Sequence, residues 1–384
     1  MMDMYYANDV VKRLKECRQL VIFGAGLVAF EVANCLMGKP YQLHISYFMV
    51  SQQYGNPDHM MGISVLDLES AKCVVRKDAI IVVATMEKHL DPIKEVLQHH
   101  GYLHIVPMTF ESDLWSLIQG DYYREYCLTS GKPYLDLETE LKKITILDDM
   151  GGCTVKVYTA KCHVDKRLKE DLSRFSWEVP IQVGAALADH MIRNVRVRDD
   201  TGVHISHKNR QYCELTALYW IWKNDTSSAY AGVCHYRRHF ELNEEQLKKL
   251  VCSDIDVVLT FPILNFPSVR EVYAHDHEQK DWDIMLEAIR VLSPEYMIDA
   301  VEIQDGNYYY GYNMFIFRKS ILNDYCAWLF PILGYCEEKC SRKRDKYQDR
   351  YIGFLAERLL TIYIRKHENE LKIVHAKKHF IKSL

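Results

Sequence analysis

The sequence LVIFGAGLVAFEVANCLM at residues 20–37 places an apolar run, two glycines and a second apolar segment in direct succession. Its first four residues are apolar and include β-branched side chains, which is typical of a buried strand. Residues 27–37 repeat apolar side chains at helical spacing and predict a helix. A strand, a tight turn made by Gly24 and Gly26, and a helix in this order form the first unit of an α/β fold.

The same alternation continues along the chain. Apolar runs at residues 44–50, 79–85 and 104–108 predict further strands, and a helical pattern follows the second of them. Strands separated by helices indicate a parallel, doubly wound sheet. We therefore predict a Rossmann-like domain over residues 1–118.

The glycine turn has the GxGxxA spacing of a pyrophosphate-binding loop, in which backbone amides at a helix N-terminus bind phosphate. The acid that binds a ribose about 20 residues later is missing, because the second strand runs into YFMVSQQYGN. Three interpretations stay open. Gly24 and Gly26 bind a dinucleotide, they bind a sugar nucleotide, or they only make the turn.

A second domain follows a segment without strand patterning. Residues 119–150 are predicted to be a helical connector, with a new strand beginning at residues 143–149. Residues 151–384 then mix strand and helix patterns and form the second domain. Its predicted strands are residues 154–160, 181–187, 229–236, 256–262 and 314–319, and its aromatic helix is residues 212–224.

Composition limits the classes of function. A length of 384 residues favours two domains, and 48 basic against 52 acidic residues give no global reason to expect a nucleic-acid partner. The 12 cysteines occur singly, which fits reduced thiols in a cytoplasm. No signal peptide and no apolar run of about 20 residues is found. We expect a cytoplasmic protein, with residues 326–336 in a core helix and a peripheral membrane contact as the alternative.

The stretch AYAGVCHYRRHFEL at residues 229–242 carries the first candidate binding residues. Ligands of open α/β sheets bind beyond the carboxyl ends of strands, where His235, Tyr236, Arg237 and Arg238 fall. Paired arginines are well suited to a diphosphate, because a guanidinium makes two charge-assisted hydrogen bonds to phosphate oxygens. The alternative is a solvated basic turn, or arginines that pair with acids of the same domain.

Polar residues upstream gather at a turn before the aromatic helix. Carboxylates and amides in such a group suit ribose or sugar hydroxyls, and Asn313, before the strand at residues 314–319, is a further candidate for a sugar hydroxyl. Glu357 and Arg358 are expected to form a buried structural pair. The upstream group consists of Asp199, Asp200, Ser206, Lys208, Asn209 and Glu214.

These blocks resemble a known family, the bacterial capsular and exopolysaccharide glycosyltransferases of uncharacterised-domain type. The resemblance covers roughly residues 153–380. It departs at Val203 and His204, where relatives more often have an acid and an amide, and this departure bears on donor or acceptor identity. The blocks that carry the resemblance are DDTG..IS.KN..YCELTALYW.WKN, Y.G..HYRR.F, NMFI and GFLAERLL, at residues 199–224, 230–240, 313–316 and 353–360.

The resemblance implies a GT-A-like nucleotide-sugar fold and transfer of a hexose in surface polysaccharide synthesis. The expected donor is a nucleoside diphosphate sugar. A UDP-linked sugar is favoured, with galactofuranose as a candidate for the transferred hexose. The acceptor would be a capsular, exopolysaccharide or O-antigen glycan or its lipid-linked form, at the inner face of the cell membrane. The competing class is an NAD(P)- or nucleotide-binding oxidoreductase or sensor built on the first domain, and the missing ribose acid argues against it.

A divalent metal and a catalytic base complete the expected chemistry. Neither Asp254-x-Asp256 nor Asp281-x-Asp283 follows a strand, so we expect arginine and histidine to do part or all of the work of a metal, and Mn²⁺ or Mg²⁺ stays open as a cofactor. Asp281 is the first choice for the base, with His275 as its orienting partner or as a phosphate contact. The alternative is that these residues only cap and begin a helix.

Overall fold

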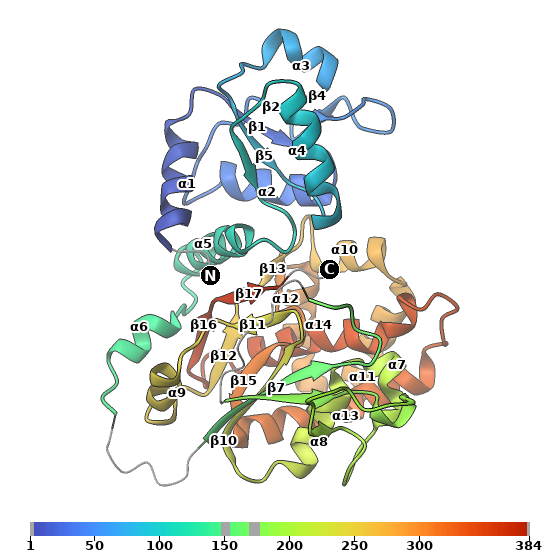
Figure 1. Cartoon of the computed structure of the whole chain (residues 1–384). Helices are drawn as coiled ribbons and strands as arrows, with labels where there is room; N and C mark the ends of the chain where they lie inside the picture. Colours follow the sequence, from blue (N-terminus) through green and yellow to red (C-terminus); the bar gives the residue numbers. More distant parts are fainter. Residues whose placement is uncertain (1–3, 147–153, 169–176, 382–384) are drawn as a thin grey trace. The chain divides into compact units, whose positions relative to one another are not determined.

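The computed structural model describes residues 4–146, 154–168 and 177–381, with the side chains of residues 4–7 excepted. The chain divides into two compact units, Met1–Lys132 and Pro133–Leu384. Each unit carries its own sheet, so the prediction of a two-domain α/β fold is confirmed (Figure 1).

The first unit is a six-stranded sheet in the order β3-β4-β2-β1-β5-β6, parallel except for the short β3. Every residue of β1 and β5 is buried, as expected for central strands of a sheet that helices cover on both faces. The predicted Rossmann-like parallel sheet is therefore confirmed. Its elements are α1 (Met4–Glu16), β1 (Leu20–Phe23), α2 (Leu27–Met37), β2 (Tyr47–Val50), β3 (His59–Met60), β4 (Ile63–Asp67), α3 (Leu68–Val74), β5 (Ile80–Val83), α4 (Leu90–His99), β6 (Ile105–Pro107) and α5 (Asp113–Thr129).

The two glycines after β1 have different surroundings. Gly24 has a φ of 129°, and a Cβ there would lie 2.5 Å from the backbone oxygen of Ala84. The close approach of two backbones therefore requires glycine at this position. Gly26 is the N-cap of α2, and a Cβ there would meet nothing within 4 Å. Whether Gly24 and Gly26 bind a nucleotide stays a prediction.

The second unit is a nine-stranded mixed sheet with β10 near its middle. The strand order is β16-β12-β15-β10-β7-β8-β9, with β11 paired to β10 and β17 paired to β11. Because β7 is parallel and β15 antiparallel to β10, the carboxyl ends of β7 and β10 share one edge with the beginning of β15. The strands are β7 (Thr154–Lys161), β8 (Glu178–Gln182), β9 (Val197–Arg198), β10 (Ser228–His235), β11 (Arg238–Phe240), β12 (Val257–Thr260), β13 (Ile263–Leu264), β14 (Tyr308–Tyr309), β15 (Phe315–Arg318), β16 (Ile373–Ala376) and β17 (Lys378–Phe380).

Helices cover both faces of this sheet. One face packs on α6 and α9, and the other on α8 and α13, where Phe315 and Phe317 contact the ring of Tyr325. Alternation along β10 places His235 on the α8–α13 side, and Asn313, which precedes β15, bonds Glu214 at the N-cap of α8. The helices are α6 (Leu137–Lys142), α7 (Asn209–Tyr212), α8 (Leu215–Asn224), α9 (Glu244–Val251), α10 (Val269–Asp276), α11 (Gln279–Leu292), α12 (Met297–Asp305), α13 (Lys319–Lys339) and α14 (Tyr351–Lys366).

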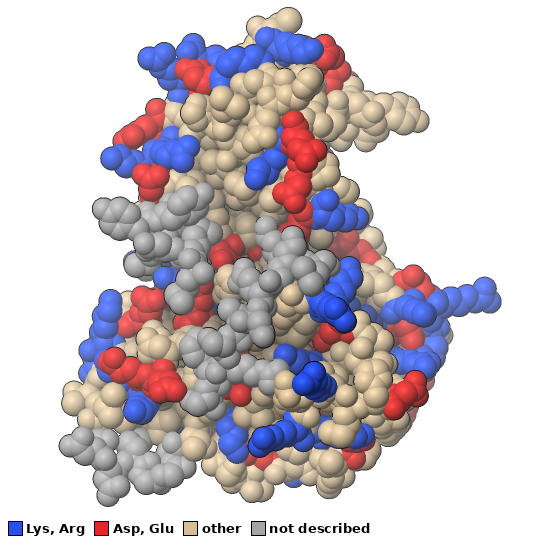
Figure 2. Space-filling view, viewed as in Figure 1, with Lys and Arg blue, Asp and Glu red and all other residues tan. Residues whose placement is uncertain are grey.

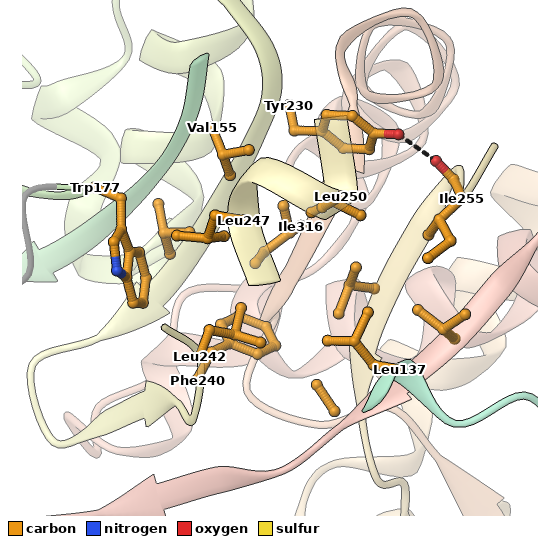
Figure 3. Close-up of a cluster of buried hydrophobic side chains, with 14 of the residues drawn as sticks. Leu137, Val155, Trp177, Tyr230, Phe240, Leu242, Leu247, Leu250, Ile255 and Ile316 are labelled. Carbon is orange, nitrogen blue, oxygen red and sulfur yellow. Dashed lines mark hydrogen bonds between the residues drawn. The ribbon is translucent and has the colours of Figure 1, made fainter. Parts of the chain in front are cut away.

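The core between the sheet and α9 also includes the first helix of the second unit (Figure 3). Leu137 of α6 lies with Leu247 and Leu250 of α9, and the hydroxyl of Tyr230 donates to the carbonyl oxygen of Ile255. Burying these side chains contributes about 1.5–3 kcal/mol each. The helix α6 is therefore part of the second unit.

The predicted connector at residues 119–150 does not exist as one segment. α5 runs across the predicted boundary at residue 118 and packs on α2 in the first unit, while α6 belongs to the second unit, and the chain divides between residues 132 and 133. Two helices without an intervening strand pattern resemble a linker in sequence, although each buries apolar side chains on a different core. Residues 144–146 are not a strand, and the rest of the strand predicted at residues 143–149 lies outside the described residues.

The apolar segment at residues 326–336 lies within α13, where Cys326, Leu329, Leu333 and Cys336 are buried. The prediction of a core helix is confirmed. Along the described ranges, no helix combines the length and apolar character that crossing a membrane requires. Basic and acidic side chains are interspersed on the face of the molecule in Figure 2, in keeping with the net charge of −4.

Candidate functional site

Polar side chains from distant parts of the chain meet where β10 ends and β15 begins. Nε2 of His235, the last residue of β10, donates to the carbonyl oxygen of Tyr312 at 2.8 Å and lies 3.7 Å from Oε1 of Glu214. Nδ2 of Asn313 donates to the same Glu214 oxygen at 2.6 Å and to the carbonyl oxygen of Gly353 at 3.2 Å. We call this group the strand-end cluster, and it consists of Glu214, His235, Tyr312, Asn313, Arg350 and Glu357.

Charges within the strand-end cluster favour an ion pair. Burial alone would lower the pKa of His235, but the Glu214 carboxylate and the Tyr312 carbonyl raise it above its usual value. Burial would likewise raise the pKa of Glu214, but His235 and Asn313 bring it below its usual value. The imidazolium and the carboxylate therefore stabilise each other at the strand end.

A second carboxylate, Glu357, has the opposite character. Its Oε1 accepts from the backbone amide of Tyr312 at 2.5 Å and its Oε2 from Nη1 of Arg358 at 2.7 Å. Burial raises the pKa of Glu357, and the Arg358 guanidinium offsets this only in part. The strand-end cluster thus combines one carboxylate that favours its charge with one that binds a proton more readily.

The backbone around the cluster is strained. Cys213, Tyr312 and Asn313 have φ values of 49°, 69° and 47°, in a region that residues other than glycine seldom occupy. Such conformations cost about 1–3 kcal/mol each and gather at functional sites. The Tyr312 amide bond to Glu357 holds one of these conformations in place, and Nε of Arg350 donates to Sγ of Cys213 at 3.1 Å.

Two polar groups in this region have no hydrogen-bond partner among the described residues. Asn313 is 1% exposed, yet nothing donates to its Oδ1. The buried Nε of Arg237 likewise lacks an acceptor. Buried polar atoms are nearly always paired, so these two atoms indicate a place where a ligand or water makes the missing bonds.

Two guanidinium groups lie at the site without an acidic partner. Within the described part of the chain, no carboxylate oxygen is within 4.0 Å of Arg237 or of Arg350. The Arg237 guanidinium carbon is 5.5 Å from the ring centre of Tyr236, and that of Arg350 is 5.6 Å from the ring centre of Phe354. Aromatic rings position these cations, and apart from Nε of Arg350, which bonds Cys213, their hydrogen-bond donors stay available for an anion.

Arg238 differs from its neighbour. It is buried, and its guanidinium carbon lies 4.1 Å from the ring centre of Tyr312, a residue of the strand-end cluster. Arg238 therefore supports the conformation of Tyr312. The structure places the sequence-predicted residues Glu214, His235, Arg237, Arg238 and Asn313 at one strand end, with Tyr236 at the adjoining turn.

The polar group at residues 199–216 has a different role from the one predicted. Asp199 is fully buried, and its carboxylate accepts from the amides of Gly184 and Ala185 at 2.9 and 3.0 Å, and from the hydroxyls of Ser206 and Thr216 at 2.5 and 2.6 Å. All of its hydrogen-bonding capacity is used within the protein. Asp199 therefore joins β8, the following loop and α8, and does not bind a sugar hydroxyl.

Three neighbours of Asp199 are also committed to the fold. Nδ2 of Asn209 donates to the Cys213 carbonyl oxygen at 2.7 Å and to the Thr216 hydroxyl at 3.1 Å. Asp200 pairs with Arg198. Lys208 donates to Glu337 at 2.6 Å. Asp200 and Asn209 bond residues close in the sequence, whereas the partner of Lys208 comes from a distant helix. Only Glu214 of this group extends into the strand-end cluster.

The structure does not bring the predicted base to the strand end. Asp281 lies in the first turn of α11, is 2% exposed and pairs with Nζ of Lys343 at 2.9 Å, and no hydrogen bond or ion pair joins it to His235, Glu214 or Asn313. The side chain of His275 is 80% exposed near the end of α10 and pairs with Asp276. The alternative interpretation of these residues, as parts of helix ends, fits their positions better.

Neither aspartate pair lies where a strand-end metal would bind. Asp254 and Asp256 precede β12 and pair with Lys372 and Arg318 at the opposite edge of the sheet. A different group, Glu178, Cys234 and His239, has ligand-type atoms within 4.8 Å of one another. Its histidine bonds Glu178 at 2.7 Å and the Tyr236 carbonyl oxygen at 3.2 Å, so this group braces the turn that carries Arg237.

Asp165 and Arg350 are not among the site residues predicted from the sequence. Asp165 follows the carboxyl end of β7, and its Oδ2 accepts from the Cys162 amide at 2.7 Å. Burial raises the pKa of Asp165 to about 6, although the charges of His235 and Arg237 act in the other direction. An acid a few residues beyond a predicted parallel strand is the signal that could have identified it. Arg350 carries no such signal, because it precedes a helix far along the chain.

The range matched by a protein family lies within the second unit. The family model described as Domain of unknown function (DUF4422) matches residues 156–369. The apo structure of the bifunctional glycosyltransferase WbbM matches with a TM-score of 0.53 and 30% sequence identity, over 60% of this chain and 46% of that one. This chain thus spans about half the length of that protein. No curated protein matches.

The two adjacent aspartates Asp199 and Asp200 allow a direct test of the structural role. Asp199→Ala leaves four buried donors without an acceptor, so we expect it to lower the free energy of unfolding by about 3 kcal/mol or more. Asp200→Asn breaks only a partly exposed ion pair and should cost less than about 1 kcal/mol. Urea unfolding followed by tryptophan fluorescence measures both, and equal losses would contradict the assignment.

Proposed function

This chain belongs to the family described as domain of unknown function DUF4422, and from that premise we propose that it is a glycosyltransferase. It transfers a sugar from a nucleoside diphosphate sugar to a glycan or lipid-linked glycan. The observation that carries the proposal is the pair of guanidinium groups, Arg237 and Arg350, beside a buried acid–amide cluster at the carboxyl edge of the sheet. The similarity to WbbM, a bifunctional glycosyltransferase, supports it.

The cationic groups would neutralise the departing diphosphate. Arg237 and Arg350 have unused donors in a fork geometry that matches phosphate oxygens. Protonated His235, favoured by Glu214, adds a third positive charge at the end of β10. Positive charge that is already in place when the sugar–phosphate bond breaks stabilises the charge that develops on the leaving group.

The acid and amide groups would hold the transferred sugar. Asn313 has a buried oxygen able to accept from a hydroxyl, and Glu214 orients this amide through its 2.6 Å bond. A sugar with several hydroxyls supplies the donors that these oxygens lack. From the sequence resemblance we propose a UDP-linked hexose as donor, with galactofuranose as the first sugar to test, in the synthesis of a surface polysaccharide at the inner face of the membrane.

Glu357 replaces Asp281 as the proposed proton acceptor for the acceptor hydroxyl. A general base works best when its pKa lies near the working pH, and burial raises the pKa of Glu357 in that direction. Asp281 is a buried partner of Lys343 instead. In this proposal one group of side chains at the strand end stabilises the leaving group, contacts the sugar and provides the base.

Nucleotide binding tests the proposal first. UDP should raise the melting temperature of the full chain and NAD should not, because only a bound ligand stabilises the folded state. Arg237→Ala should weaken UDP binding by about 1.5–3 kcal/mol and abolish sugar transfer, with little change in melting temperature. The matched control is Arg290→Ala, an exposed arginine on α11. Protection by NAD and not by UDP would favour an oxidoreductase or sensor.

Removal of divalent metal tests how the diphosphate is neutralised. Because arginine and histidine occupy the strand end and both aspartate pairs lie elsewhere, we expect transfer to survive an excess of chelator at least in part. Release of nucleotide from a panel of nucleotide sugars measures this. Complete loss of activity that Mn²⁺ or Mg²⁺ restores would show that a bound metal does this work.

The base assignment predicts a pH dependence. Glu357→Gln should reduce turnover by about 10²-fold or more, the usual contribution of a general base. In the wild type, turnover should fall as the pH drops through the raised pKa of Glu357, because only the carboxylate accepts a proton, and the variant should lack this decrease. Asp281→Asn is the comparison. A large loss of turnover in this variant alone would return the role to Asp281.

A further inference from the structure

The order of strands around β10 gives the site two sides. β15 lies on one side of β10 and β7 on the other, and His235 is paired with Ala160 of β7. Asn313, with Glu214 bonded to it, belongs to the β15 side. The chain beyond β7 belongs to the other side, and it carries a carboxylate that the proposed function has not used, Asp165.

Asp165 is held rigidly in a turn. Its backbone amide donates to the Cys162 carbonyl oxygen at 3.0 Å, and its Oδ2 accepts from the Cys162 amide at 2.7 Å. Its other oxygen, Oδ1, has no hydrogen-bond partner among the residues that the structure describes. A carboxylate with one oxygen fixed and one unused can accept further hydrogen bonds from a ligand.

The surroundings of Asp165 connect it to the proposed diphosphate site. The charged and titratable groups that influence it are Lys161 and Cys162 on its own strand end, and His235, Tyr236 and Arg237 on the β10 turn. Among the residues with described positions, no cation is within ion-pair distance of Asp165, so none of them neutralises its carboxylate directly. Because β7 and β10 are adjacent parallel strands, Asp165 and Arg237 follow neighbouring strand ends at the same edge of the sheet.

A nucleoside diphosphate sugar extends in two directions from its diphosphate. If the diphosphate lies at Arg237 and the sugar lies with Asn313 on the β15 side, the nucleoside extends towards β7. The acids expected from the sequence to hold ribose do not serve, because Asp199 is saturated by four internal donors and Asp200 pairs with Arg198. We propose that Asp165 accepts hydrogen bonds from the ribose hydroxyls of the donor, an inference that rests on the proposed function.

The protonation behaviour of Asp165 adds a pH signature. Burial raises its pKa to about 6, so the group is a carboxylate at pH 7.5 and largely protonated at pH 5. A protonated acid accepts fewer hydrogen bonds from hydroxyls. Preference for ribose over a sugar without these hydroxyls should therefore decrease as the pH falls through 6.

Calorimetric binding of UDP and of 2′,3′-dideoxyuridine diphosphate to the full chain tests the inference. At pH 7.5 the wild type should bind UDP about 10- to 100-fold more tightly than the dideoxy analogue, the range expected for hydrogen bonds to a charged group. Asp165→Asn should lose about the same factor for UDP and bind both nucleotides similarly. Asparagine can still accept the Cys162 amide bond, so this variant keeps the turn, and Asp165→Ala checks the result.

A control and three outcomes complete the design. Asp324→Asn, an exposed aspartate on α13, should retain the preference of the wild type. If the wild type binds neither nucleotide, the proposed function and the inference both fail. If the wild type binds UDP and Asp165→Asn keeps the same affinity and preference, only the inference is overturned. If Asp165→Asn binds UDP as the wild type does but has lost sugar transfer, the inference is also overturned, and Asp165 is identified as a proton acceptor.

Discussion

The Asp199 carboxylate is the constraint on which the candidate site depends. It accepts hydrogen bonds from two backbone amides just after β8 and from two hydroxyls in the loop and helix that follow β9. A fully buried charge is tolerated only when its hydrogen bonds are complete. Satisfying Asp199 therefore dictates how three separate segments come together, and Glu214 at the beginning of α8 is placed by that arrangement.

The position of Glu214 then determines the orientation of Asn313 and the charge of His235. Its carboxylate accepts from Asn313 and lies 3.7 Å from His235, so three segments far apart in the chain are joined by one charge. The positive φ values of Tyr312 and Asn313 aim these residues at the cluster, and the Tyr312 amide bond to Glu357 stabilises that conformation. The structure thus uses one buried acid for the fold and a second to organise polar groups that could contact a ligand.

The long polar motif at residues 199–224 illustrates how structural and functional roles are interleaved. Asp199, Asn209 and Thr216 bond one another or nearby backbone, and Asn224 bonds the backbone of Val203 at 2.9 Å. Such residues keep a loop in one conformation, while a single member, Glu214, reaches the strand-end cluster. Residue types that suit sugar hydroxyls are the same types that satisfy buried backbone amides, and a sequence alone does not distinguish the two uses.

Local patterns were sufficient for part of this protein. The apolar run, glycine turn and helix at residues 20–37 predicted the parallel sheet of the first unit, because strand and helix periodicity are properties of adjacent residues. The position of His235 and Arg237 at and just beyond the end of an apolar strand likewise followed from the chain alone. Tertiary structure decided the rest, since burial and partners depend on residues far away. Asp281 forms an ion pair with Lys343, and the Asp199 carboxylate accepts hydrogen bonds from four donors. The helix α6 packs on a core whose other residues follow it in the chain. The adjacency of Asp165 and Asn313 to the end of β10 came from the strand order, which no local pattern specifies.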